Sequence, residues 1–487
     1  MSFLFILLAT ASLFAQIEQG VVRIKLSESK AAMLQNTKVS KSGAGYLRTG
    51  DVSLDVAFAE CKANGLKRVF RHGGKFEAKH RKHGLHLWYE ISFDKGVSVS
   101  SAVAAFAKLS DVQVSEPIHE KAIIGYHPMK MKEIFSLSTE ADDPQYSNQW
   151  HYNNTGQTGG TVDADVDLPE AWNLETGNSD IIVAVTDGGI DVDHEDLAAN
   201  MWVNTAEIPG NGIDDDGNGY VDDINGYGFG DNSGTIPADP HGTHVGGTVA
   251  AVTNNGIGVA GVAGGSGSGD GVRLMSCAAF GANGVGGFAE TYIYGADMGA
   301  VISQNSWGYT NPGVFEQAVL DAIDYFIAEA GFDESGNPDG PMQGGIVIFA
   351  AGNDGLDAEW YPGIYEPVLA VGGTDHNDGE YTSSNRGDWV EMAAPAVDVV
   401  STTPGNTYSS FTGTSMACPH VSGVAGLIIS QNLGNITPTQ VWARLVQTTD
   451  PLPGLEFFGS GILNAFAAFL QDDGVAPEAI VDLAVAS

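Results

Sequence analysis

Residues 413–420 have the sequence Gly413-Thr414-Ser415-Met416-Ala417-Cys418-Pro419-His420, and the apolar stretch that follows, Val421 to Ser430, predicts a helix. The N-terminus of a helix presents free backbone N–H groups and a partial positive charge, which favour a developing oxyanion. Pro419 fits within the first turns, where a missing N–H costs little. A serine hydroxyl alone is a poor nucleophile, so a nucleophilic Ser415 requires a base and a group that orients the base.

Two upstream segments supply these groups. Asp187 ends the apolar run of residues 181–186, which predicts a strand buried on both faces. His241 begins a run of small residues, 241–248, that predicts the start of a buried helix. Asp, His and Ser in this order form one of the known hydrolytic triads, although a lone Asp or His after an apolar run is more often structural.

The three motifs, in order and spacing, resemble the catalytic domain of the subtilisin-like serine proteases over residues 141 to 470, roughly two thirds of the chain. The resemblance implies an α/β fold: a three-layer domain with a mainly parallel sheet flanked by helices. It also implies that Asp187, His241 and Ser415 are the triad and that His244 is only a packed neighbour. Gly188 and Gly246 stand where the family commonly has Ser or Thr and Ala, and neither change removes a catalytic atom.

The same resemblance assigns the oxyanion site and the substrate cleft. Asn353 would be the side-chain oxyanion donor, and the Ser415 N–H would be the second donor. Substrate backbone would pair with an edge segment, and the specificity pocket would be walled beside Asn353; these expected substrate-binding residues are Ser306, Trp307, Gly308, Ala351 and Gly352. Asp187, Ser306 and Asn353 each follow an apolar run, and open parallel α/β sheets place their ligands beyond such strand ends. This layout supports the site without the resemblance.

Charge divides the chain into two parts. Residues 16–140 hold 19 Lys and Arg against 13 Asp and Glu, whereas residues 141–487 hold three arginines against 47 acidic residues. The first part predicts a small α+β domain, with strands at 20–26 and 85–91 and a helix at 97–109, and it resembles the family's inhibitory prosegment. We expect its positive charge to strengthen association with the acidic domain. An unrelated N-terminal binding domain is the alternative to a prosegment. We predict that maturation occurs near residues 138–143.

The acidic second part argues against nucleic acid or an anionic membrane as partner. Self-repulsion should destabilise the fold unless cations or salt offset it, which suggests a saline habitat as a hypothesis. Residues 1–15 are apolar and too short to span a bilayer, so we interpret them as a secretory signal peptide; a misassigned start or a buried strand is the alternative. We expect a secreted monomer without membrane insertion.

Calcium is the cation that the sequence suggests. The segment 214–223 places oxygen ligands at alternate positions around a glycine turn, with Asp214, Asp216, Asn218, the Tyr220 carbonyl and Asp222 as expected ligands. A solvated acidic turn is the alternative, because the twelfth loop position is Asn225 rather than Glu. The family resemblance implies a second, structural calcium site, and its expected ligands are Asp143, Asp196, Asn255, Ile257 and Val259, with Asn254 as the alternative to Asn255.

The remaining features are less specific. Cys61, Cys277 and Cys418 cannot all pair within one chain, and Cys418 is interpreted as a small buried filler. Residues 471–487 form a linker whose segment 476–485 is similar to the first strand of a fibronectin type III domain; a frayed tail is the alternative. Aligned with the family, Trp360 lies near the base of the specificity pocket and would shorten it, while Asp354 and Glu359 near the rim would favour basic or polar side chains.

These observations predict a secreted, calcium-stabilised serine endopeptidase that is made as a zymogen. Its partners would be polypeptide substrates and, before maturation, its own prosegment. A pseudoprotease or a secreted binding scaffold is the non-enzymatic alternative, and the presence of Asp187, His241, Asn353 and Ser415 disfavours it. A relative that acts as an esterase or a peptide ligase is a further alternative.

Overall fold

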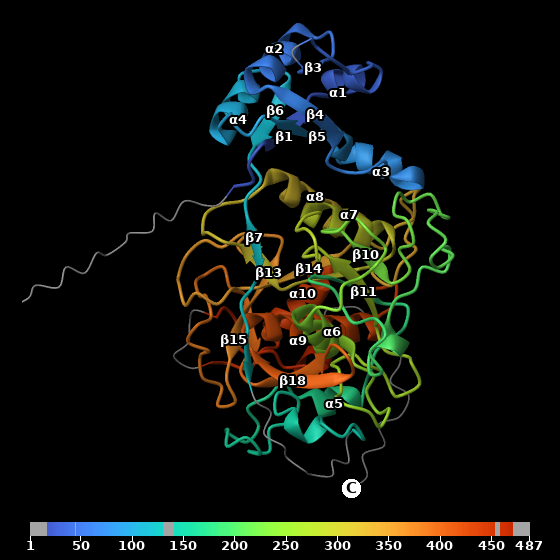
Figure 1. Ribbon diagram of the computed structural model, residues 1–487. Coiled ribbons are helices and arrows are strands. Elements are labelled where there is room, and N and C mark those ends of the chain that lie inside the picture. The colour runs from blue at the N-terminus through green and yellow to red at the C-terminus, as the bar shows by residue number, and fades with distance from the viewer. Residues whose placement is uncertain (1–16, 44, 130–140, 453–457, 471–487) are drawn as a thin grey trace, which may run out of the picture.

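The computed structural model describes residues 17–43, 45–129, 141–452 and 458–470. A small N-terminal domain lies at one end of a larger domain, and an extended segment that carries β7 (Lys121–Ile123) runs from the small domain along the large one (Figure 1). The predicted signal peptide, the predicted linker at 471–487 and residues 138–140 of the predicted maturation region lie outside the described residues.

The small domain is an antiparallel sheet covered by helices, in the strand order β4-β5-β1-β6. Phe58 of α2 and Phe106 of α4 contact each other edge to face in its core, with ring centroids 5.9 Å apart. Its elements are β1 (Val21–Leu26), α1 (Glu28–Gln35), β2 (Ser40–Lys41), β3 (Leu47–Arg48), α2 (Val52–Cys61), β4 (Ala63–Arg68), η1 (Gly74–Phe76), α3 (Glu77–Lys82), η2 (Leu85–Leu87), β5 (Trp88–Phe93), α4 (Val99–Ala107) and β6 (Val112–Glu116).

The predicted small-domain elements occur with shifted bounds. β1 and α4 lie within the ranges expected for a strand at 20–26 and a helix at 97–109. The strand expected over 85–91 begins only at Trp88, because residues 85–87 form a 3₁₀ turn after Gly84, whose φ of 70° is left-handed. Alternating apolar residues alone did not reveal this turn.

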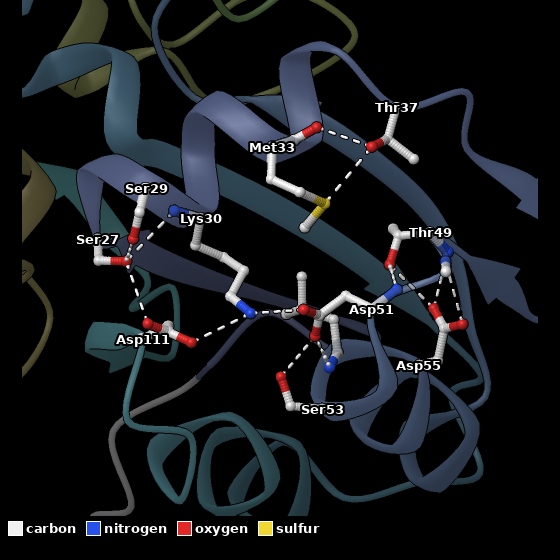
Figure 2. A network of polar contacts seen from close by, with 12 residues as sticks. Ser27, Ser29, Lys30, Met33, Thr37, Thr49, Asp51, Ser53, Asp55 and Asp111 are labelled. Atoms are coloured by element: carbon white, nitrogen blue, oxygen red, sulfur yellow. Dashed lines mark hydrogen bonds and ion pairs between the residues drawn. The ribbon is translucent and has the colours of Figure 1, made fainter.

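A lysine joins three parts of the small domain. Lys30 Nζ in α1 contacts Asp51 Oδ2 at 2.6 Å and Asp111 Oδ2 at 3.1 Å (Figure 2). Asp51 is also the N-cap of α2, where its side chain accepts the Leu54 N–H. The hydrogen bond from Lys30 holds the pKa of Asp51 well below its usual range. One cation therefore ties the start of α1, the cap of α2 and the loop before β6.

The large domain contains a seven-stranded parallel sheet in the order β10-β11-β9-β12-β14-β15-β16. Its elements are η3 (Tyr146–Asn148), α5 (Leu168–Trp172), β9 (Ile182–Asp187), η4 (Ala198–Asn200), β10 (Gly226–Gly228), α6 (Pro240–Ala250), β11 (Arg273–Ala278), α7 (Phe288–Asp297), β12 (Ile302–Asn305), β13 (Trp307–Tyr309), α8 (Gln317–Glu329), β14 (Ile346–Ala350), β15 (Leu369–Thr374), β16 (Met392–Pro395), β17 (Val399–Thr403), β18 (Thr407–Thr412), α9 (Thr414–Gln431), α10 (Pro438–Gln447) and α11 (Ala467–Leu470).

The sheet is buried on both faces, which makes a three-layer domain. Val183 and Val185 of β9 pack into one core with residues of α6, α9 and α10, whereas Ala184 packs into a second core with residues of α7 and α8. Successive side chains of a strand point to opposite faces, so a strand between two helical layers needs apolar residues at nearly every position. The uninterrupted apolar run before Asp187 satisfies this requirement, and the predicted fold class is confirmed.

The central helix, α9, has Ser415 at its N-terminus, as the sequence predicted. It starts at Thr414, so Ser415 lies in its first turn, and Pro419 lies inside it. Proline removes the N–H that would bond the carbonyl four residues back, here that of Ser415. The Ser306 hydroxyl donates to that carbonyl at 3.1 Å instead. This replacement lets the helix continue through Pro419.

Candidate active site

The carboxyl end of β9 and the first turn of α6 bring Asp187 and His241 together. His241 Nδ1 lies 2.9 Å from both carboxylate oxygens of Asp187, and the two residues are buried. Asp239 is the N-cap of α6 and accepts the N–H groups of His241 at 2.9 Å and Gly242 at 3.0 Å. Asp187 therefore holds the imidazole ring of His241, and Asp239 holds its backbone at the start of α6.

This contact fixes the tautomer of the imidazole. An ionised carboxylate only accepts hydrogen bonds, so Nδ1 of His241 carries the proton and Nε2 is left as the basic nitrogen. Within the described part of the chain, Nε2 is buried and has no hydrogen-bond partner. A free basic nitrogen at this position is what a general base for a neighbouring hydroxyl requires.

Ser415 contacts the segment that follows the small domain. Its Oγ donates to the backbone carbonyl of Ile124 at 2.8 Å. The hydroxyl is at the N-terminus of α9, where the sequence placed it, but its partner is a peptide carbonyl rather than the imidazole of His241. This contact places Ser415 beside a peptide group of the segment; attack on the carbon of that group would require the hydroxyl proton to turn toward Nε2 of His241.

Asn353 follows β14 and reaches the same segment. Its Oδ1 accepts both the N–H and the hydroxyl of Thr414 at 2.9 Å, which directs Nδ2 toward the cleft. Nδ2 donates to the carbonyl oxygen of Gly125. The amide is thus oriented by the residue next to Ser415, and in this structure it binds the carbonyl one residue beyond the one that Ser415 contacts.

The predicted edge segment pairs with an extended backbone. β7 (Lys121–Ile123) runs antiparallel to β13, with Ala122 opposite Gly308 and Ile123 opposite Trp307. The Ile124 N–H then donates to the Ser306 carbonyl at 3.0 Å. Ser306, Trp307 and Gly308 therefore bind this segment through the main-chain bonds by which a sheet edge binds a peptide.

A pocket of about 300 Å³ opens beside this backbone. Among the residues that line it are Ala351 and Gly352, as the sequence predicted, together with Ile124. Trp360 and Asp354 also line it, but Glu359 does not belong to its described lining. Most of the remaining lining is apolar, with contributions from Trp307, Phe349, Ala350 and Tyr361. The pocket chemistry is therefore mainly apolar.

One acidic cluster coincides with the predicted calcium loop. Carboxylate oxygens of Glu207, Asp214 and Asp216 lie within 4.8 Å of one another. The loop residue Asn218 approaches the cluster, since its Nδ2 contacts Asp216 Oδ2 at 3.2 Å, and its Oδ1 accepts the Tyr220 N–H at 2.7 Å. Asp222 points elsewhere, because its carboxylate accepts the N–H groups of residues 211 and 212. Sequence reasoning missed Glu207, which lies outside the loop.

The second expected calcium site also has its acidic residues together. Asp143 accepts the N–H groups of residues 254 and 255, and Asp196 accepts the Asn255 side-chain amide at 2.8 Å and the Val259 N–H at 2.9 Å. Ile257 donates its N–H to Asn255 Oδ1 at 2.7 Å. Burial raises the pKa of Asp143 to about 6. The pKa of Asp196 is raised to about 7, chiefly by burial and also by the nearby charge of Asp143.

Two buried carboxyl groups that repel each other fit a bound divalent cation, which would relieve the repulsion. Asn255, rather than Asn254, carries the side chain that contacts Asp196. The Asn254 side chain instead accepts the N–H of Asp142 at 3.2 Å. Both placements agree with the ligand choice made from the sequence, which stays a prediction.

The opposite charges of the two domains meet in specific pairs on α7 and α8. Glu316, fully buried at the start of α8, binds Arg23 Nη1 at 2.6 Å and also binds Lys121. Farther along α8, Lys25 contacts Asp321 at 2.6 Å. The same surface includes the pairs His80–Asp297, Lys82–Glu329 and His83–Glu329. Basic residues of the first part of the chain therefore pair with acidic residues of the second part at this interface.

An acidic residue of the small domain completes the interface. Glu116 accepts the N–H groups of Gln317 at 2.7 Å and Ala318 at 3.2 Å. These are unpaired donors of the first turn of α8, so Glu116 acts as a helix cap supplied by the other domain. Burial raises the pKa of Glu116 to about 7.

Two further observations bear on the sequence predictions. Across the described ranges, no helix combines the length and apolarity that a membrane crossing needs. Cys61, Cys277 and Cys418 are buried and unpaired. Burial raises the pKa of the Cys418 thiol far above its ordinary value, so Cys418 packs as an apolar side chain.

Comparison with known proteins gives two family matches. The profile described as "Subtilase family" matches residues 178–468, and the profile described as "N-terminal of Subtilase family" matches residues 29–156.

Relatives and solved structures agree with these matches. A thermophilic serine proteinase from Bacillus sp. (strain AK1) is 35% identical over 61% of this chain and 64% of its own length. Thermitase from Thermoactinomyces vulgaris is 33% identical over 62% of this chain and 93% of its own length. The crystal structure of fervidolysin from Fervidobacterium pennivorans, described as a keratinolytic enzyme related to subtilisin, aligns with a TM-score of 0.62 at 22% identity, covering 93% of this chain and 61% of that one. That likeness concerns the fold.

Proposed function

This chain belongs to the subtilase family of serine endopeptidases and carries the family's N-terminal propeptide, and from this premise we propose that it is a calcium-stabilised, secreted zymogen. Its triad would be Asp187, His241 and Ser415, with Asn353 as oxyanion donor. The observation that carries the proposal is the contact of the Ser415 hydroxyl with a peptide carbonyl, 2.8 Å from Ile124 O, in a cleft where Asp187 holds His241.

Each residue has a chemical role in peptide-bond hydrolysis. Ser415 Oγ attacks the scissile carbonyl carbon while Nε2 of His241 accepts its proton. Asp187 keeps the Nδ1 proton in place and stabilises the imidazolium that forms. Nδ2 of Asn353 and the Ser415 N–H stabilise the oxyanion of the tetrahedral intermediate. His241 then gives its proton to the leaving amine, and water releases the acyl group from Ser415.

Extended polypeptides are the proposed substrates. The edge strand β13 offers main-chain hydrogen bonds that do not depend on sequence, and the pocket beside it supplies selectivity. Trp360 and the other apolar walls favour a medium-sized apolar side chain, such as that of Ile124, whereas Asp354 favours a basic one. Cleavage of a peptide library decides between these two preferences.

Calcium is proposed to bind at two places. Glu207, Asp214 and Asp216 would hold one ion, with oxygens of the 214–223 loop completing the shell. Asp143, Asp196 and Asn255, with the carbonyls of Ile257 and Val259, would hold the other. Each ion would stabilise the fold by neutralising clustered carboxylates and would take no part in hydrolysis.

The proposed division of the chain is a signal peptide at 1–15, a prosegment at 16–140, a catalytic domain at 141–470 and a linker at 471–487. The ion pairs on α7 and α8 support the view that the small domain is built to bind the large one. Secretion follows from the proposed signal peptide, and the prosegment would keep the enzyme inactive until that point.

The test is expression of the full chain and its Ser415→Ala variant with calcium, followed by intact mass and casein digestion. We expect the wild-type chain to shorten itself and digest casein, and the variant to remain full length and inactive. If both chains fold, remain full length and leave casein intact, the chain is a binding scaffold and the proposal is wrong.

A further inference from the structure

The segment Ala122–Gly125 lies in the cleft as a substrate would. Ala122 and Ile123 pair with β13, and Ile124 extends this pairing through its N–H to the Ser306 carbonyl. Ile124 also lines the specificity pocket. Its carbonyl oxygen is the peptide oxygen that Ser415 Oγ contacts, at 2.8 Å. The backbone on this side of the nucleophile is therefore bound up to and including Ile124.

The chain continues across the nucleophile and is bound on the other side too. The Gly125 carbonyl accepts from Asn353 Nδ2. The Tyr126 ring lies over the catalytic centre, with its centroid 5.0 Å from that of His241 and 4.3 Å from that of Phe411. β8 (His127–Met129) then pairs antiparallel with β18, with Pro128 opposite Phe411. Residues 125–129, which we name the exit strand, therefore fill the side of the cleft where the leaving part of a substrate lies.

We propose that the first self-cleavage breaks the Ile124–Gly125 bond, and that the exit strand then stays in the cleft and delays activity. The proposal rests on the proposed protease function. It replaces the maturation site predicted near residues 138–143, because the bond in contact with Ser415 lies well upstream of that region.

The cleavage is an ordinary acyl transfer. Ser415 Oγ forms an ester with the Ile124 carbonyl carbon, the bond from that carbon to Gly125 N breaks, and His241 protonates the new Gly125 amine. Water then hydrolyses the ester, which frees Ser415 and leaves Ile124 with a carboxylate. The products are a prosegment that ends at Ile124 and a catalytic chain that begins at Gly125.

The two products differ in how they are held. The prosegment stays by its ion pairs on α7 and α8 and can dissociate as a separate chain. The exit strand is covalently part of the catalytic chain, so its effective concentration at the cleft does not fall on dilution. Release of the prosegment therefore opens the pocket side of the cleft, while the other side remains covered until the exit strand is removed.

The experiment follows the first cleavage product over time. Full-length chain is refolded with calcium, samples are quenched at intervals, and intact mass and N-terminal sequencing identify each species. The expected first Ser415-dependent product begins at Gly125. A first product that begins at Tyr126, or between 130 and 143 with no earlier Gly125 species, overturns the proposal, whereas absence of any Ser415-dependent product contradicts the proposed protease function instead.

Two variants test the parts separately. Ile124→Asp places a charge in the apolar pocket and should slow the first cut at least tenfold. The matched control Val56→Asp adds the same charge at an exposed position of α2, outside the cleft, and should cut at nearly the wild-type rate. Circular dichroism checks that both variants fold, and equal rates for the two would contradict the assignment of Ile124.

The exit strand is tested through the delay before casein digestion. Tyr126→Ala removes the ring that lies on Phe411, so the interval between the first cut and full activity should shorten severalfold. His127→Ala, at an exposed position of the exit strand, is the control and should leave the interval unchanged. If the species that begins at Gly125 is fully active as soon as the prosegment dissociates, the inhibitory role is wrong.

Discussion

A Cβ atom on Gly188 would lie 2.4 Å from the carboxyl carbon of Asp239. Asp239 caps the helix that carries His241, and Gly188 directly follows Asp187. The close approach of Gly188 and Asp239 therefore lies between the segments that carry Asp187 and His241. The glycine that departs from the family pattern therefore has a structural reason: its missing side chain leaves room for the cap. Gly246 is different, because a Cβ there would meet the mobile end of Ile190 at 3.1 Å.

We predict opposite outcomes when the two glycines are changed to the residues common in the family. Gly188→Ser should displace Asp239 and cost about 1–3 kcal/mol of stability, the usual range for overpacking, with a clear loss of kcat. Gly246→Ala should keep both stability and activity near the wild-type values. Thermal unfolding of the Ser415→Ala background and casein digestion by the active chains measure the two effects. Equal behaviour of the variants would refute the contact-based explanation.

Asn353→Ala should lower kcat by about 10²–10³-fold with little change in KM, because it removes a donor that acts mainly on the oxyanion. Steady-state kinetics on a peptide substrate provide the measurement. Thr414→Ser is the control, since it retains the hydroxyl that orients Asn353 and should have a much smaller effect. A change confined to KM would mean that Asn353 binds the ground state only.

Calcium should raise the melting temperature of the catalytic domain, and Asp214→Asn should reduce that rise. Ligand binding to the folded state contributes about 2.7 kcal/mol at a hundredfold excess over Kd. Asp222→Asn is the matched control, because the Asp222 carboxylate accepts two backbone N–H groups and lies outside the acidic cluster. Titration with calcium after EDTA treatment measures the rise. If the calcium-induced rise in melting temperature were reduced equally in both variants, Asp222 would also be a calcium ligand.

Prosegment binding should weaken as the pH rises from 5 to 8. The pKa of Glu116 is raised to about 7 in the complex, chiefly by burial and then by the nearby charge of Glu316, so the complex takes up a proton that the separated prosegment does not hold. The contribution of Glu116 to prosegment binding is therefore complete below the ordinary glutamate pKa, and it is lost as the pH rises through about 7. We expect at least about a tenfold change, since one pKa unit is tenfold in an equilibrium constant.

Glu116→Gln should flatten this pH dependence, because glutamine does not titrate. The measurement is the dissociation rate of the cleaved prosegment from the catalytic chain at several pH values. Glu120→Gln, close by in the sequence, is the control. A pH slope that survives unchanged in Glu116→Gln would mean that Glu116 is not the group responsible for it.

The sequence by itself determined the family, the fold class and the residues of the proposed triad. It could do so because these features depend on local patterns: apolar runs buried on both faces, a helix N-terminus at Ser415, and polar residues at the ends of parallel strands. Bounds of elements were less certain: the strand predicted over 85–91 begins only at Trp88, because a 3₁₀ turn follows the left-handed Gly84.

Only the tertiary structure decided which groups meet across long separations. Glu207 joins the acidic loop from outside it, Glu116 caps a helix of the other domain, and Ile124 reaches Ser415 from 291 residues upstream. None of these contacts has a local sequence signal, since each depends on how two folded surfaces pack together. For the same reason the sequence placed the first cut near the start of the catalytic domain, whereas the bound backbone favours Ile124–Gly125.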